Sequence, residues 1–165
     1  MADEPERRFL LADGFSPVGM ARESMLIIQD YLPDTGSWAV RVRWTTSALG
    51  TVYHLTLKSP KSAVTNNEHE IEISREAYMD ILASCAASVT KTRYIVRNGV
   101  DDWEVDVYHH PKADPPMIAE IELASEEQSL SLPEWIGREV TGDRWYSNAQ
   151  IAARLTQIDK ETVDG

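Results

Sequence analysis

The feature that most constrains this chain is a set of short segments in which charged residues of one sign alternate with other residues. The clearest segment spans residues 118–123, where Glu120 and Glu122 alternate with Ile121 and Leu123. Alternate side chains of a β-strand point to opposite faces, so the two glutamates share one face. Residues two apart on a strand lie about 7 Å apart, close enough for two carboxylates to share a divalent cation. Taken alone, such a pair more often marks a solvated strand face.

The same spacing recurs along the chain. Like-charged pairs separated by one residue occur at Glu4 and Glu6, Arg41 and Arg43, Glu68 and Glu70, Lys91 and Arg93, and Glu104 and Asp106. Strand after strand therefore carries like charges on one face, which predicts a shared charged surface. Alternation fixes the two faces of a strand but not which face is inside. Two assemblies remain open: a sandwich with its charged faces in water, and a closed barrel whose charged faces line a lumen.

Turn residues separate these segments and define the predicted strands. The predicted strands span residues 4–11, 24–32, 38–45, 51–58, 68–73, 89–97, 102–108 and 118–123. Asn98 and Gly99, between two of them, form the strongest hairpin signal in the chain. A count of about eight strands predicts a mainly β fold.

Helix signals are fewer. Ser74 is the expected N-cap of a helix over residues 75–86, in which apolar residues recur at helical spacing. Two patterns fit the capping box, one beginning at Ser125 and one at Ser147. The second is predicted to open a terminal helix that continues through Leu155.

Length and charge limit the possible functions. A chain of 165 residues suits one domain, which we expect to span residues 1–165. Lys and Arg number 16 against 27 Asp and Glu, and the formal net charge is −11. This balance argues against a general binder of nucleic acid or of an anionic membrane, so neither partner is expected. A phosphate-binding protein with this charge would need clustered cations, a metal, or both.

Cellular location and assembly are constrained less strongly. Cys85 is the only cysteine, which excludes an internal disulfide. No apolar run is long enough to span a bilayer, and the acidic start does not resemble a signal peptide. We therefore expect a cytoplasmic protein that is a monomer or a homodimer.

Taken in order, the charged segments resemble the CYTH family of triphosphate tunnel metalloenzymes, and specifically its small bacterial inorganic triphosphatases. The segments that carry the resemblance are Glu4-Pro5-Glu6-Arg7-Arg8, Gln29-Asp30-Tyr31-Leu32, Arg41-Val42-Arg43, Thr56-Leu57-Lys58, Glu68-His69-Glu70-Ile71, Lys91-Thr92-Arg93-Tyr94, Glu104-Val105-Asp106, Glu120-Ile121-Glu122 and Tyr146-Ser147-Asn148. Together they cover about residues 4–155. The resemblance implies a closed eight-stranded antiparallel barrel, tunnel-like and with a few short flanking helices, whose acidic and basic residues face inward.

The resemblance also implies metal-dependent hydrolysis of a triphosphate, with inorganic triphosphate as the favoured small phosphorylated substrate and Mg²⁺ or Mn²⁺ as cofactor. The implied metal ligands are Glu4, Glu6, Glu104, Asp106, Glu120 and Glu122. The implied phosphate contacts are Arg8, Arg41, Arg43, Lys58, Lys91, Arg93 and Arg144. The implied catalytic residues are Tyr31, Arg8, Glu104 and Asp106. Such a set suits phosphoryl transfer, which depends on charge neutralisation and positioning more than on a protein nucleophile.

Three positions depart from the family pattern. Arg8 stands where the family signature has a lysine, Asn66 where many members have an arginine, and Trp145 where a basic residue is common. Arg8 keeps its charge at any working pH, so it cannot take part in a proton relay. These departures leave alternatives open: a catalytically weakened module that binds polyphosphate or a triphosphate, or an activity of the adenylate cyclase or thiamine triphosphatase type.

Overall fold

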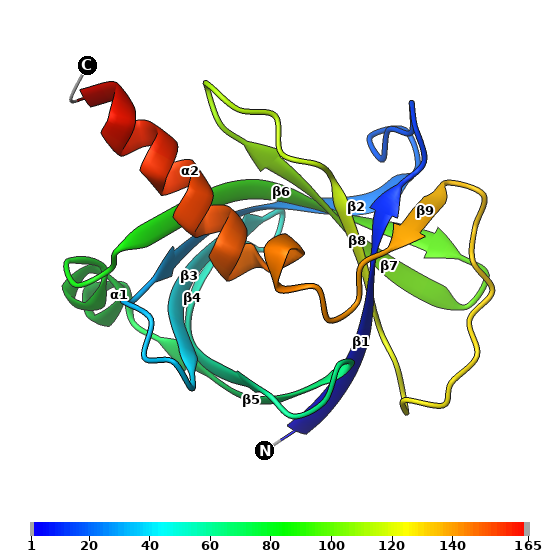
Figure 1. Ribbon diagram of the computed structural model, residues 1–165, viewed down its shortest axis with the longest axis horizontal. Coiled ribbons are helices and arrows are strands. Elements are labelled where there is room, and N and C mark those ends of the chain that lie inside the picture. Colours follow the sequence, from blue (N-terminus) through cyan, green and yellow to red (C-terminus); the bar gives the residue numbers. More distant parts are fainter. Residues whose placement is uncertain (1, 164–165) are drawn as a thin grey trace.

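A closed ring of antiparallel strands dominates the computed structural model, which describes residues 2–163 and the side chains of residues 5–163 (Figure 1). The strands are β1 (Ala2–Leu11), β2 (Ala21–Tyr31), β3 (Ala39–Ser47), β4 (Gly50–Pro60), β5 (Thr65–Ile73), β6 (Ala87–Asn98), β7 (Asp101–His109), β8 (Ile118–Glu122) and β9 (Ile136–Glu139). The helices are α1 (Arg75–Leu82), the 3-10 turn η1 (Arg144–Tyr146) and α2 (Asn148–Val163). None of these helices combines the length and apolar character that a membrane span requires.

Closure of the ring depends on the first strand. The strand order is β5-β4-β3-β2-β6-β7-β8-β1, and residues 2–5 of β1 pair with residues 65–68 of β5. Residues 6–10 of β1 pair with β8, and the end of β1 also pairs with β9, which lies outside the ring. The eight-stranded antiparallel barrel expected from the resemblance is thus confirmed. Pro5, which has no N–H to donate, is tolerated where β1 leaves one partner for the other.

Register places the charged faces inside the barrel. Glu104 pairs with Glu120 across β7 and β8, and Glu120 pairs with Arg8 across β8 and β1. Opposite residues in neighbouring strands share a face, so the three side chains form one row inside the barrel. The intervening residues point outward, and the outer positions of β1, β7 and β8 form a buried core with the chain segment that carries β9.

A second core closes one end of the barrel. Inward-facing apolar residues at that end, including Val89, Tyr108 and Ile118, pack against Ile151 and Leu155 of α2. Figure 1 shows α2 crossing that end of the ring. The interior therefore changes along its length from an apolar end under α2 to a charged middle.

Helix α1 begins as predicted but ends early. Ser74 Oγ accepts a hydrogen bond from Ala77 N, which is the expected N-cap. The helix stops at Leu82 instead of residue 86. The chain must return to the sheet, and Ala86 N already donates to Tyr31 O of β2 at 2.8 Å.

Three further features differ from the prediction. Residues 125–128 form a turn and not a helix, because Gln128 Oε1 accepts a hydrogen bond from Ala124 N instead of capping a helix. Strand β9 was not predicted, since its four residues form a strand only where the edge of β1 receives them. Helix α2 continues past Leu155 to Val163.

Candidate active site

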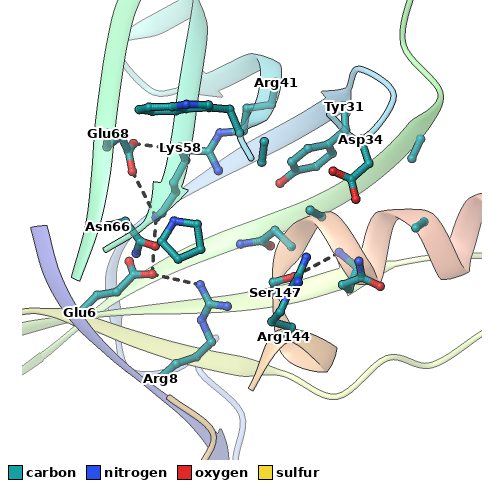
Figure 2. Close-up of a pocket in the computed structure, with 18 of the residues that line it drawn as sticks. Glu6, Arg8, Tyr31, Asp34, Arg41, Lys58, Asn66, Glu68, Arg144 and Ser147 are labelled. Atoms are coloured by element: carbon teal, nitrogen blue, oxygen red, sulfur yellow. Dashed lines mark hydrogen bonds and ion pairs between the residues drawn. The ribbon is translucent and has the colours of Figure 1, made fainter. Parts of the chain in front are cut away.

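The charged middle of the barrel encloses a cavity of about 820 Å³ (Figure 2). The charged side chains of the barrel strands that line it are Glu6, Arg8, Arg41, Arg43, Lys58, Glu68, Glu70, Arg93, Glu104, Glu120 and Glu122. Arg144 and Ser147, beside the start of α2, line it from the side opposite Lys58 and Glu68 (Figure 2). The strand alternation therefore brings most of the candidate residues to one place.

One group, which we call the loose cluster, consists of Arg41, Arg43, Lys58, Glu68 and Glu70 on β3, β4 and β5. Arg43 Nη2 lies 2.7 Å from Glu70 Oε2, and Lys58 Nζ lies 3.1 Å from Glu68 Oε2. Arg41 Nη2 is farther away, 3.7 Å from Glu68 and 4.0 Å from Glu70. The loose cluster thus places three cations side by side, and one of them has only long ion pairs.

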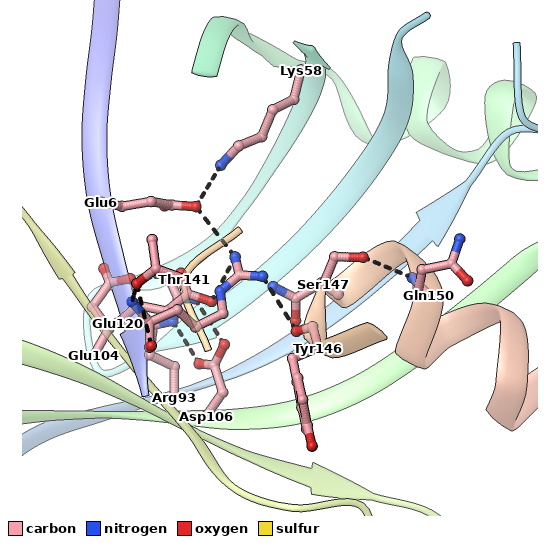
Figure 3. A network of polar contacts seen from close by, with 12 residues as sticks. Glu6, Lys58, Arg93, Glu104, Asp106, Glu120, Thr141, Tyr146, Ser147 and Gln150 are labelled. Carbon is pink, nitrogen blue, oxygen red and sulfur yellow. Dashed lines mark hydrogen bonds and ion pairs between the residues drawn. The ribbon is translucent and has the colours of Figure 1, made fainter. Parts of the chain in front are cut away.

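Arg8 connects β1 to two other parts of the cavity wall. Its Nη2 lies 3.2 Å from Glu6 Oε1 and 3.3 Å from Glu120 Oε1, and its Nη1 donates to Tyr146 O at 3.2 Å. Lys58 Nζ approaches the same Glu6 oxygen at 3.4 Å (Figure 3), and Figure 2 shows Glu6 between Arg8 and Lys58. A lysine at position 8, with one nitrogen, could not supply this fork of contacts.

The second group, which we call the tight cluster, consists of Lys91, Arg93, Glu104 and Asp106 on β6 and β7. Arg93 Nε and Nη2 donate to the two oxygens of Asp106 at 2.7 and 2.9 Å, and Arg93 Nη1 lies 2.5 Å from Glu104. Lys91 Nζ lies 2.5 Å from Asp106 Oδ2 and donates to Asn148 Oδ1 at 3.0 Å. Arg93 is therefore held by a bidentate contact that lies behind the cavity wall.

The carboxyl groups of Glu104, Glu120 and Asp106 differ in the direction in which their surroundings shift the pKa. Burial raises the pKa of Glu104, the neighbouring Glu120 and Asp106 raise it further, and Arg93 offsets only part of this effect. Burial also acts to raise the pKa of Glu120, but Arg8 and Arg93 lower it below its ordinary value. Against the same effect of burial, Arg93 and Lys91 hold the pKa of Asp106 far below its ordinary range. Glu104 is thus the carboxylate of these three that most readily takes a proton.

Two expected site residues lie outside the cavity. Lys91 and Asp106 have no exposed surface and do not line it, because they are paired with each other beneath α2. A direct phosphate contact by Lys91 and direct metal binding by Asp106 do not fit this geometry. Burial lowers the pKa of Lys91 to about 8 although Asp106 opposes the shift. The side chain of Glu4 lies outside the described residues.

Of the remaining positions, Tyr31 and Asn66 line the cavity, and Trp145 does not. Tyr31 lines it, and its hydroxyl accepts a hydrogen bond from Gln29 Nε2 at 2.9 Å. Asn66 lines it where the resemblance expects an arginine. Trp145 is 58% exposed, and the guanidinium of Arg154 lies 3.9 Å from its ring centre.

Sequence reasoning missed several supporting residues. Thr56 is buried and donates to Glu70 Oε2 at 2.7 Å, and Thr141 Oγ1 accepts a hydrogen bond from Arg8 N at 3.0 Å. Thr56 could have been found, because alternation places it on the same strand face as Lys58. Thr141 carries no such signal, since it lies in the segment between β9 and η1.

The acidic residues fit a hard divalent cation in chemical type. Within the described residues, no three acidic, histidine or cysteine side chains converge on a common point. Glu120 Oε1 is nevertheless buried and makes no hydrogen bond, although Arg8 Nη2 lies 3.3 Å from it. Mg²⁺ is usually held by one or two carboxylates together with the phosphates of a substrate, without a complete protein cage. The carboxylates at this cavity suit that kind of site.

Comparisons with known proteins define the class to which this barrel belongs. The family model described as the CYTH domain matches residues 3–154. The chain therefore belongs to the CYTH domain family.

Two curated relatives and a solved structure align with nearly the whole chain. The inorganic triphosphatase of Acetivibrio thermocellus is 30% identical over 98% of this chain and 100% of its own length. The inorganic triphosphatase of Nitrosomonas europaea is 34% identical over 92% of this chain and 98% of its own length. A crystal structure of an inorganic triphosphatase matches with a TM-score of 0.61 at 32% identity, over 92% of this chain and 95% of the other.

Proposed function

We propose that this protein hydrolyses inorganic triphosphate, using water to cleave a terminal phosphoanhydride bond and release phosphate. The observation that carries the proposal is the cavity inside the barrel, where Arg8, Arg41, Arg43, Lys58 and Arg93 converge in an otherwise acidic protein. The curated relatives named inorganic triphosphatase support it, since they align over nearly the whole chain.

Binding is assigned to the cations that line the cavity. The loose cluster holds Arg41, Arg43 and Lys58 within reach of one anionic ligand, and its ion pairs can exchange a carboxylate for a phosphate oxygen. Arg93 presents its remaining donors from the facing wall. Arg144 approaches from the start of α2 and completes the enclosure of the substrate.

Glu6, Glu104, Glu120 and Glu122 are the described carboxylates that would hold a divalent cation, Mg²⁺ or Mn²⁺, together with the substrate. A bound cation would neutralise charge on the phosphate oxygens. Arg8 lies between Glu6 and Glu120, where its positive charge offsets the repulsion between these two carboxylates in the absence of substrate.

Proton transfer falls to groups other than Arg8. The guanidinium does not release a proton at a working pH, so its contribution is electrostatic. Glu104, whose pKa is raised, is suited to accept the proton of an attacking water. Tyr31 lies at the cavity, where its hydroxyl can orient substrate or water. Asp106 remains ionised and acts by holding Arg93.

Phosphate release from a panel of substrates tests this proposal. Inorganic triphosphate, longer polyphosphate, ATP and thiamine triphosphate are each incubated with Mg²⁺, with Mn²⁺ and with excess chelator. The expected result is metal-dependent release that is fastest with inorganic triphosphate. Tight stoichiometric binding without turnover would instead identify a binding module, the role that the missing cations at Asn66 and Trp145 would favour.

A further inference from the structure

Asn148, the first residue of α2, is only 8% exposed, and its side chain does not cap its own helix. Ser147 Oγ accepts the hydrogen bond from Gln150 N at 3.2 Å and so fills the capping role. Asn148 Oδ1 instead accepts hydrogen bonds from two barrel side chains, Lys91 Nζ at 3.0 Å and Tyr108 Oη at 2.8 Å. The amide oxygen therefore lies where β6, β7 and α2 meet.

Lys91 connects this oxygen to the cavity wall. Its ammonium is fully buried and donates to Asn148 and to Asp106. Asp106 is also fully buried and binds Arg93 through both of its oxygens. Arg93 lines the cavity and directs Nη1 toward Glu104. A continuous chain of contacts thus runs from the first residue of α2 to a guanidinium at the cavity.

The position of α2 does not depend on Asn148 alone. Thr156 Oγ1 accepts a hydrogen bond from Ser88 N at 3.0 Å, and Ile151 and Leu155 pack in the core beneath the helix. Removing the Asn148 amide would leave the buried ammonium of Lys91 with one acceptor fewer. The ammonium would then shift on Asp106 and disturb the carboxylate that orients Arg93.

We propose that Asn148 is a positioning residue for hydrolysis. Its amide oxygen holds Lys91 and, through Lys91 and Asp106, fixes the guanidinium of Arg93 in the direction of the substrate phosphate. The inference rests on the proposed function and adds a residue that acts without donating to the substrate. The oxygen at this place suits the role because it accepts the hydrogen bonds of both Lys91 and Tyr108.

A double-mutant cycle with inorganic triphosphate tests the connection. We expect Asn148→Ala to lower kcat/KM about tenfold in the wild-type background. In an Arg93→Lys background, which lacks the bidentate fork, the same substitution should cost less than about twofold, because coupled residues are not additive. Equal losses in the two backgrounds would overturn the proposal, since Asn148 would then act independently of Arg93.

Two further variants distinguish the positioning of Arg93 from the general attachment of α2 to the barrel. Thr156→Val removes another hydrogen bond between α2 and β6, and it should change kcat/KM by less than about twofold. Asn148→Asp keeps the acceptor oxygen and should retain activity within about threefold of wild type. A Thr156→Val variant as impaired as Asn148→Ala, or an Asn148→Asp variant that fails equally, would contradict the positioning role. Circular dichroism checks folding, and Asn148→Ser, too short to reach Lys91, replaces Asn148→Ala if the latter does not fold.

A measurement without substrate makes the test independent of turnover. The Nε–H signal of Arg93 in a nitrogen-15 NMR spectrum should exchange slowly with solvent in wild type and in Thr156→Val, and about tenfold faster or more in Asn148→Ala. Unchanged exchange in Asn148→Ala would overturn the inference. A wild-type protein that releases no phosphate from triphosphate would contradict the proposed function alone, while the Arg93 signal would still decide whether Asn148 positions Arg93.

Discussion

The loose cluster lines the cavity with all of its side chains, whereas the tight cluster reaches the cavity only through Arg93 and Glu104, and the two clusters differ in how their charges are paired. In the tight cluster, Asp106 receives Lys91 Nζ, Arg93 Nε and Arg93 Nη2, all within 2.9 Å, and it exposes no surface. In the loose cluster, the ion pairs of Arg41 are 3.7 and 4.0 Å long, and its buried Nε has no hydrogen-bond partner among the described residues.

This difference has a functional consequence. A buried bidentate pair is costly to break, because a single partner left behind would be an uncompensated charge. A longer pair at the cavity surface can exchange its partner for a phosphate oxygen at little cost. We therefore expect the loose cluster to govern how strongly triphosphate binds, and the tight cluster to keep Arg93 in one orientation.

The largest effect on activity is expected at Glu120, whose carboxylate lies beside both Arg8 and Arg93. Glu120→Gln keeps the shape of the side chain but removes the charge that a divalent cation needs, so kcat should fall about a hundredfold or more. The measurement is phosphate release from inorganic triphosphate over a titration of Mg²⁺ and of Mn²⁺. Glu72→Gln, on β5 but away from the cavity lining, is the matched control and should keep wild-type turnover. Equal turnover in both variants would remove Glu120 from the metal site.

The next prediction compares the two clusters directly. Arg41→Ala should raise KM about ten- to a hundredfold with little change in the melting temperature, because its ion pairs are long. Arg93→Ala should lower both activity and thermal stability, because it leaves the buried carboxylate of Asp106 paired with Lys91 alone. Steady-state kinetics and thermal unfolding of both variants provide the comparison. A larger loss of stability in Arg41→Ala would reverse the distinction between the clusters.

Arg8 should show an intermediate effect. Arg8→Ala removes a charge-assisted contact and should lower binding or rate about ten- to a hundredfold. Arg8→Lys keeps the charge but loses the fork that also reaches Tyr146 O, so we expect activity within about tenfold of wild type. The measurement is a pH–rate profile of all three proteins. If the missing proton carrier limits the enzyme, Arg8→Lys will raise kcat and change the profile, and equal activity in all three would show that Arg8 does not contact the reacting phosphate.

The smallest effect is expected outside the barrel, where Arg7 makes two hydrogen bonds of 2.8 Å to Glu139. The hydrogen bonds from Arg7 lower the pKa of Glu139 although burial opposes the shift. Both side chains are partly exposed, so solvent screening should limit the loss in Glu139→Gln to about 0.5 kcal/mol of unfolding free energy.

The pH dependence of this effect follows from the lowered pKa of Glu139. A lowered folded-state pKa stabilises the protein above the unfolded value of about 4.3, and the stabilisation disappears as pH falls through the folded-state pKa. Urea unfolding of wild type and Glu139→Gln at neutral and at acidic pH measures the difference. A difference that persists in acid, or that high salt does not reduce, would contradict a screened surface pair.

Much of the site could be predicted from the sequence because strand alternation is a local property. The spacing of Arg41 and Arg43, or of Glu120 and Glu122, assigns each pair to one strand face whatever the rest of the chain does. The hairpin at Asn98 and Gly99 is similarly local: it joins β6 to β7, and Gly99 adopts a φ of 62°. The resemblance to the CYTH family then selected the barrel over the sandwich, and the strand pairing confirms that choice.

Only the tertiary structure decided that the barrel closes, how deep each charged side chain lies in it and which residues form its ion pairs. The inside of the barrel exists because residues 2–5 of β1 pair with β5, and such distant pairing leaves no local sequence signal. Glu104 and Asp106 share a strand face, but residues two apart differ by about 7 Å along the strand. That distance places Glu104 at the cavity and Asp106 beneath α2 with Lys91. The sequence determined which face each side chain occupies, and the packing of α2 across one end decided which of those side chains a substrate can reach.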